Sequence, residues 1–198
     1  MKRVLNSVPL LYIALLIPGV RSLRGLVDTS LYYPEMMYIS GVWSIQLLFL
    51  TIAVTPALTV INKLGTGKAF GRWLLKRRKH FGLASFIFAA VHAAHYVLYV
   101  ADLSIIFAQT LHWDYALGWL GFVIFLALAV TSNATSARAL GRKWKILHLA
   151  IYPAIALSFL HWYLFDAFTQ QLFFWMACFG TLKLVHILLK PVPVLKRV

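Results

Sequence analysis

Seven histidines stand in a chain whose apolar stretches contain almost no other ionisable side chain. His92 and His95 lie three residues apart in one apolar run, and His148 and His161 lie thirteen apart in another. An ionisable residue inside a membrane span is costly and indicates a functional site by default. Neutral imidazoles between apolar helices, with few carboxylates beside them, suit the iron of b-type haem. The histidine pattern therefore favours haem binding.

The elements that must position these histidines are membrane helices. The chain has 198 residues, of which 62% are hydrophobic and 12% charged, whereas a soluble domain carries roughly 25% charged residues. Lipid leaves helices or closed barrels as the only spanning structures, and long continuous apolar runs are typical of helices. The runs cover residues 4–20, 37–61, 81–100, 116–132, 146–165 and 168–189. We therefore predict an all-α integral membrane protein, a six-helix bundle that forms a single domain over residues 1–198.

The charges predict the orientation of this bundle. With six spans, the basic residues of an expected loop over 62–80, of the segment 133–145 and of both tails fall on one side. The five acids fall on the other side: Asp28, Glu35, Asp102, Asp114 and Asp166. The positive-inside rule makes the basic side cytoplasmic, with both termini there. The net charge of +14 is thus explained by topology, which disfavours a nucleic-acid partner.

Helix rise gives the depth of each histidine. At about 1.5 Å per residue, His92 lies about 18 Å along its span, and His95 and His161 lie about 22 Å along theirs. One iron is therefore expected near the outer leaflet, between His161 and either His92 or His95, with depth favouring His95. Each histidine could instead serve as a helix–helix hydrogen-bonding residue.

His148 needs a separate account. It lies about 140° around an ideal helix from His161, so the two do not share a face, and Pro153 between them predicts a kink. His148 is a candidate ligand for a second, inner haem, with His80 as its partner, or a contact for a propionate, a quinone or a flavin. His112 and His186 are expected to be solvated or interfacial.

Several short stretches between Ser40 and Leu164 are shared with a known family. The matched positions are Ser40, Gly41, Thr55, Pro56, Gly82, His92, Thr131, Ser132, Gly141, Arg142, Trp144, His148, Tyr152 and His161. On these residues the chain resembles the MsrQ/YedZ family, within the ferric-reductase-like transmembrane group. It departs from the family pattern at Phe81, where leucine is usual, and at residues 112–114, where an Arg-Pro pair is common.

The resemblance implies a haem b subunit of the bacterial inner membrane that transfers electrons for an oxidoreductase complex. Its expected donor is quinone or a cytoplasmic flavin reductase, and its expected acceptor is a periplasmic molybdopterin enzyme that reduces methionine sulfoxide. Carried over by position, the haem-iron ligands are His92, His148 and His161; His95 and His80 are haem-proximal candidates. One or two haems and a further cofactor, FMN, are implied, with no catalytic residue in the chain itself.

Two other functions use the same residues. A transmembrane ferric or cupric reductase would need an outer metal-chelating cluster, for which Asp102, His112 and Asp114 are the candidates. A proton or solute transporter would use the histidines as a relay, and intramembrane carboxylates or matched broken helices would favour it. No Asp or Glu lies in the middle of a run.

Overall fold

The described part of the chain is helical throughout. The computed structural model describes residues 7–28, 30, 32–165 and 170–189. Its elements, in chain order, are α2 (Val8–Leu16), a 3₁₀ turn η1 (Ile17–Gly19), α3 (Val20–Arg24), α4 (Tyr33–Leu64), α5 (Lys68–Val100), α6 (Leu103–Thr110), α7 (Trp113–Val130), α8 (Ala134–Leu140), α9 (Arg142–His148), α10 (Ile151–Phe165) and α11 (Gln170–Leu189). The predicted all-α class is confirmed.

Five helices are long and apolar enough to cross a membrane: α4, α5, α7, the combined segment Arg142–Phe165, and α11. The first expected span, residues 4–20, lies partly outside the described residues. Its described part is divided among α2, η1 and α3, and the break falls at Pro18 and Gly19. Five predicted crossings are therefore supported by the structure, and the sixth stays a prediction.

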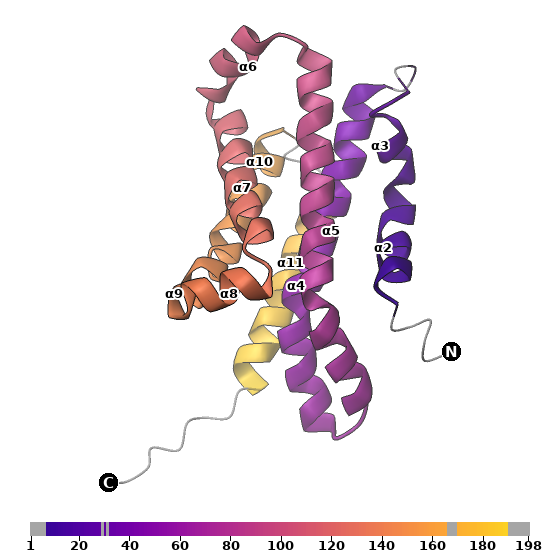
Figure 1. Ribbon diagram of the computed structural model, residues 1–198, viewed down its shortest axis with the longest axis vertical. Coiled ribbons are helices and arrows are strands. Elements are labelled where there is room, and N and C mark those ends of the chain that lie inside the picture. The colour runs from indigo at the N-terminus through magenta and orange to yellow at the C-terminus, as the bar shows by residue number, and fades with distance from the viewer. Residues whose placement is uncertain (1–6, 29, 31, 166–169, 190–198) are drawn as a thin grey trace.

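The broken N-terminal segment packs against α5 (Figure 1). A Cβ atom at Gly19 would lie 2.1 Å from Cε1 of Phe88, so only glycine allows this approach. Tyr12, Leu15, Leu16 and Leu23 pack against a buried cluster of Leu47, Ala84 and Phe88. This small core holds α2 and α3 on one side of the bundle.

The centre of the bundle is a long antiparallel hairpin of α4 and α5. The prediction of a loop over residues 62–80 is wrong, because only residues 65–67 separate the two helices. Gly65 and Gly67 adopt positive φ angles of 70° and 71°, which ends one helix and begins the next. The basic stretch after Gly67 is helical because lysine, arginine and leucine are good helix formers. At about 1.5 Å per residue α5 is about 50 Å long, against a hydrocarbon core of about 30 Å.

The remaining helices cover the other side of the hairpin (Figure 1). α7 packs along α10, and α11 packs against α4. A second core cluster joins this group to α4; its members are Leu48, Ile52, Phe125, Ala154 and Ile155.

The predicted kink near Pro153 is present. α9 ends at His148 and α10 begins at Ile151, and Pro153 has no N–H to donate to the Leu149 carbonyl one turn earlier. His148 and His161 therefore stand on separate helices.

Candidate functional site

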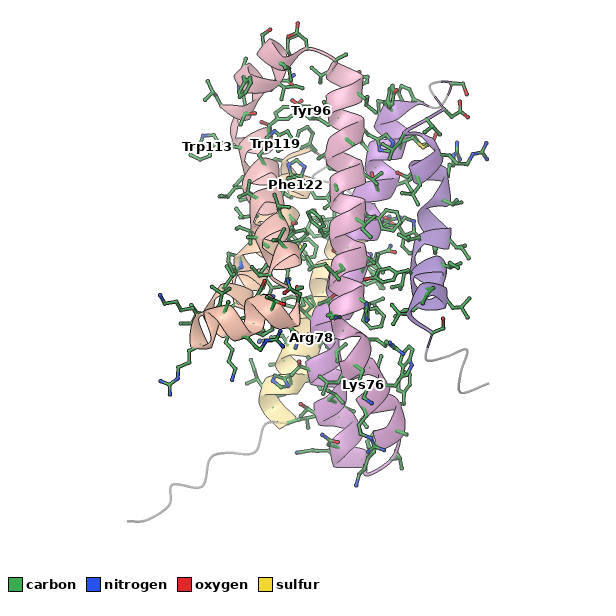
Figure 2. All side chains as sticks on the ribbon, in the orientation of Figure 1. Lys76, Arg78, Tyr96, Trp113, Trp119 and Phe122 are labelled. Atoms are coloured by element: carbon green, nitrogen blue, oxygen red, sulfur yellow. The ribbon has the colours of Figure 1, made fainter. Side chains whose placement is uncertain are left out.

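A cavity of about 540 Å³ lies between α4, α5, α7 and α10. Its volume falls in the usual range for a small-molecule or cofactor site. Aromatic side chains form much of its wall, and Figure 2 shows Tyr96, Trp119 and Phe122 between α5 and α7. The Tyr96 and Trp119 ring centroids are 6.2 Å apart, and those of Trp119 and Phe122 are 6.1 Å apart. The cavity is therefore an apolar space with few polar groups.

Two of those polar groups are His92 on α5 and His161 on α10. Their ring centroids are 6.1 Å apart with the ring planes nearly perpendicular. Nδ1 of His92 lies 2.8 Å from the Met37 carbonyl oxygen, and Nδ1 of His161 lies 2.6 Å from that of Asp114. A carbonyl oxygen can only accept, so each Nδ1 carries the proton and donates. Each Nε2 is left with its lone pair, which is the arrangement that metal-ligating histidines use.

Glycines give both rings their access to these carbonyls. Gly41 follows Met37 by one helical turn, and a Cβ atom there would lie 3.1 Å from Nδ1 of His92. Gly118 follows Asp114 by one turn, and its Cβ would lie 2.7 Å from Cε1 of His161. Each histidine thus reaches a helix carbonyl through the gap left by a missing side chain.

The spacing of His92 and His161 is compatible with both rings holding one iron through Nε2. Two metal–nitrogen bonds of about 2 Å each, together with the ring radii, would separate the imidazole centroids by roughly 6 Å. The apolar aromatic wall suits a porphyrin. Within the described residues no three His, Cys, Asp or Glu side chains gather as ligands for a bare metal ion, and Asp102, His112 and Asp114 form no such cluster.

His95 lies outside this cavity. Its side chain is fully buried, and it faces the N-terminal segment, where a Cβ atom at Gly25 would lie 3.1 Å from its Nε2. Neither ring nitrogen forms a well-aligned hydrogen bond within the described part of the chain, although the backbone of Ser22 and Val91 approaches the ring. The structure therefore brings His92, rather than His95, to His161.

His148 and His80 are not brought together. His148 stacks on Trp144, with centroids 3.9 Å apart, and its Nε2 lies 3.4 Å from Oγ of Ser132. Its Nδ1 donates to the Trp144 carbonyl across 3.0 Å. His80 instead faces α2, where its Nδ1 lies 3.1 Å from the hydroxyl of Tyr12. The pairing of these two histidines around a second haem has no contact to support it.

Two side chains of α11 contact neighbouring helices. Lys183 lies with Nζ 4.8 Å from the centroid of the Tyr152 ring. His186 contacts Thr59 through Nδ1 and the threonine hydroxyl, 3.1 Å apart. His112 is exposed at the start of α7, as expected.

Sequence reasoning missed the groups that orient the two cavity histidines. The Met37 and Asp114 acceptors are backbone atoms, which a sequence pattern does not display. Gly118 was the available signal, since a glycine inside a continuous apolar helix usually has a packing reason.

Comparison with known proteins agrees with this geometry. Residues 40–159 match the family described as ferric reductase like transmembrane component. The chain belongs to this family. The matched stretch contains α5, α7 and most of α4 and α10, so it includes His92 and ends two residues before His161.

The chain is also similar to proteins named protein-methionine-sulfoxide reductase heme-binding subunit MsrQ. The one from Brucella anthropi is 37% identical over 124 residues, which cover 61% of this chain and 52% of the relative. The one from Xanthomonas axonopodis pv. citri is 35% identical over 136 residues, or 66% of this chain and 58% of the relative. The predicted resemblance to the MsrQ/YedZ family is confirmed, and the matched part of the chain spans little more than half the length of these relatives.

Proposed function

We propose that this chain is a haem b subunit that carries electrons across a bacterial inner membrane. The observation that carries the proposal is the pair His92 and His161, which lie across one apolar cavity with each Nδ1 held by a helix carbonyl. The names of the MsrQ relatives, which describe heme-binding subunits, support it.

His92 and His161 would hold the iron through Nε2. Haem, when bound, supplies one-electron redox chemistry at its iron. The Met37 and Asp114 carbonyls keep each proton on Nδ1, which fixes the tautomer and raises the basicity of the opposite nitrogen. The aromatic wall excludes water and lowers the local dielectric, and both effects tune the reduction potential.

The direction of transfer follows from the charge distribution. The basic end of α5 and the segment 133–145 form the proposed cytoplasmic face, where a positive potential attracts an anionic flavin or an acidic reductase. A quinone within the bilayer is the other proposed donor. The proposed acceptor is a periplasmic molybdopterin enzyme that reduces methionine sulfoxide in oxidised proteins. The MsrQ relatives are named as heme-binding subunits of a protein-methionine-sulfoxide reductase, which supports the methionine sulfoxide part of this proposal.

The cofactor content is part of the proposal. One haem is assigned to the cavity. A second haem would use His148, whose Nε2 lies 3.4 Å from the Ser132 hydroxyl. FMN is proposed as a further cofactor on the family resemblance alone, so haem and flavin released from purified protein should both be quantified.

The test is an absorption spectrum of the detergent-purified chain, oxidised and then reduced with dithionite. The wild type should give a reducible b-type spectrum, and His161→Ala should lose the component assigned to the cavity. His112→Ala is the matched control, because His112 is an exposed histidine outside the cavity. If well-folded wild type binds no haem, the electron-transfer proposal is wrong and a histidine-relay transporter becomes the leading alternative.

A further inference from the structure

A second hollow, of about 40 Å³, lies far from the histidine cavity along α5. Four helices contribute to it: α4, α5, α10 and α11. Its polar lining residues are Thr55, Arg78, Tyr152, Lys183 and His186. Arg78 precedes His92 by fourteen residues on α5, which corresponds to about 21 Å along the helix. The hollow is thus a separate feature of the opposite end of the bundle.

Three nitrogen-bearing side chains converge on this hollow. Nη1 of Arg78 donates to the Thr55 hydroxyl across 3.2 Å. Nζ of Lys183 lies over the Tyr152 ring, and Nδ1 of His186 contacts the Thr59 hydroxyl. Each of these contacts is made with a neutral group, so the charges of Arg78 and Lys183 are left without a compensating anion there.

No described carboxylate stands near enough to supply that anion. Asp28 and Glu35 lie before or at the start of α4, and Asp102 and Asp114 lie beyond the end of α5. Those are the opposite ends of the α4–α5 hairpin from Arg78. Between the described residues the one ion pair joins Arg21 to Glu35, at 3.1 Å.

A cation inside a membrane helix is costly, so Lys183, with no described anion beside it and with Arg78 across the hollow, predicts a ligand. Lys183 lies within the apolar helix α11, and Arg78 faces it across the hollow. A planar guanidinium, an ammonium group and hydroxyl donors together match the oxygens of a phosphate. The volume corresponds to roughly three water molecules, which suits a single phosphate group and excludes a flavin ring or a porphyrin.

We propose that this hollow binds a phosphate group, carried by an anionic phospholipid of the adjacent leaflet. The side chain of Tyr152, which lines the hollow, is 43% exposed, and the exposed face of a membrane helix meets lipid. The site is therefore open sideways to a headgroup. Basic pockets between membrane helices on the cytoplasmic side bind lipid headgroups in this way. A soluble phosphate would be recognised by the same donors, and the experiment separates the two sources.

The experiment measures thermal unfolding of the purified full chain in detergent with four additions: phosphatidylglycerol, phosphatidylcholine, inorganic phosphate, and sodium chloride at matched ionic strength. Phosphatidylglycerol should raise the unfolding midpoint of the wild type by about 5 °C, as expected for a ligand at roughly 100 times its dissociation constant. Phosphatidylcholine and chloride should have little effect.

Variants assign this shift to the hollow. Arg78→Gln and Lys183→Met should each lose most of it, and Arg78→Lys should keep part of it because the charge is retained. Lys76→Gln is the matched control: it removes one charge from an exposed residue about 200° around α5 from Arg78, and Figure 2 labels both side chains. Native mass spectrometry counts the lipids that each variant retains. It replaces the thermal measurement for any variant whose unfolding midpoint is already low without added lipid.

The outcomes separate cleanly. Lipid-dependent stabilisation that is lost with Arg78 or Lys183 supports a headgroup site. The same pattern with inorganic phosphate alone supports a phosphate site filled from solution. If the wild type responds to neither, or if Lys76→Gln loses as much stabilisation as Arg78→Gln, the proposal is overturned. Haem content does not enter any of these readings, so the test is independent of the proposed electron transfer.

Discussion

Two neighbouring histidines of α5 lie in contrasting surroundings, His92 partly buried and His95 fully buried. They are three residues apart, and each lies against a glycine of another segment whose Cβ atom would lie 3.1 Å from a ring nitrogen. On the His92 face the ring donates to a helix carbonyl and borders a cavity of about 540 Å³. On the His95 face the ring is fully buried between α5, α3 and α4, and it forms no well-aligned hydrogen bond with the described residues.

This contrast separates the proposed ligand from a packing residue. Residue type is the same for both, and His95 is the more deeply buried, so burial alone does not identify the ligand. The distinguishing features of His92 are an acceptor that fixes the Nδ1 proton and a cavity beside the ring. By these criteria His161 belongs with His92, and His95 belongs to the packing of the N-terminal segment.

The largest expected effect comes from replacing His92 and His95, one at a time, with alanine. His92→Ala should remove at least about 90% of the haem bound in the cavity, because it deletes one of the two proposed iron ligands. His95→Ala should leave haem content within about twofold of the wild type. The measurement is the pyridine haemochrome content of purified protein, normalised to protein concentration. Loss of haem in His95→Ala with retention in His92→Ala would reverse the assignment.

A smaller effect is expected from closing the gap beside His161. Gly118→Ala places a Cβ atom 2.7 Å from Cε1 and 2.8 Å from Nδ1 of the ring, so the imidazole must move away from the Asp114 carbonyl. Loss of such an orienting contact costs roughly 10-fold in cofactor affinity. Haem retention during dilution and the reduction midpoint potential would both report it.

Gly180→Ala is the matched control for that substitution. It also adds a methyl group to a membrane helix, but no described atom lies within 4 Å of the new Cβ. Equal haem loss in the two alanine variants would mean that helix flexibility, rather than the position of His161, decides the affinity.

The next prediction concerns stability on the His95 face. A buried polar group without a partner costs about 1–3 kcal/mol, so an apolar residue of similar size should be tolerated or stabilising. We expect His95→Leu to raise the free energy of unfolding, or to leave it within about 1 kcal/mol of the wild type. Denaturant titration in detergent micelles is the measurement.

Ser85→Ala gives that experiment a contrasting control on the same helix. The Ser85 hydroxyl donates to the Ser44 carbonyl across 2.8 Å, in a buried contact between α5 and α4. Its removal should lower the free energy of unfolding by about 1 kcal/mol. A larger loss in His95→Leu than in Ser85→Ala would show that His95 has a bound partner.

The smallest effect is expected at the outer mouth of the cavity. Gln109 on α6 accepts a hydrogen bond of 2.6 Å from the Tyr96 hydroxyl, and Asp102 caps α6 by accepting from the Ser104 and Ile105 amides. Hydrogen bonds from the Ser104 hydroxyl and amide lower the pKa of the Asp102 carboxyl below its ordinary value of 3.8. Its stabilisation is therefore present above that value and is lost as the pH falls through the lowered pKa.

Hydrogen–deuterium exchange of the α6 amides checks this prediction. Asp102→Ala should exchange faster than the wild type at neutral pH, whereas protection in the wild type should persist until the pH falls below about 4. Faster exchange of wild-type α6 already at pH 6 would contradict the role assigned to the carboxylate. Haem content should change little in either case.

Much of this architecture was predictable from the sequence, and particular residues show where prediction stopped. Continuous apolar runs indicated the membrane helices because every residue contributes to the signal. The basic stretch after Gly67 is predicted as a loop from its high charge, although its lysines, arginines and leucines also have high helix propensity. Depth along the span favours His95 as the partner of His161. Helix rise gives only the position of a residue along the helix axis, and it does not show which neighbouring helix the side chain contacts.

The site resisted prediction for a related reason. The Met37 and Asp114 acceptors are backbone oxygens, and every residue has one. Only the packing of four helices brings these two oxygens within hydrogen-bonding distance of the cavity histidines. Likewise, Arg78 and Lys183 line the same hollow although they are more than a hundred positions apart in the chain. A single sequence does not show that two such distant residues lie close together.

The three-residue turn at Gly65–Gly67 also has a consequence for biogenesis. Three residues and their flanking bonds reach about 14 Å when fully extended, less than half of the roughly 30 Å hydrocarbon core. While both helices stay folded, α4 and α5 therefore behave as one unit, since neither can invert while the other stays in place. The cationic tip of that unit would fix the side of the bilayer on which it remains, and the orientation of every later helix would follow from that of the hairpin.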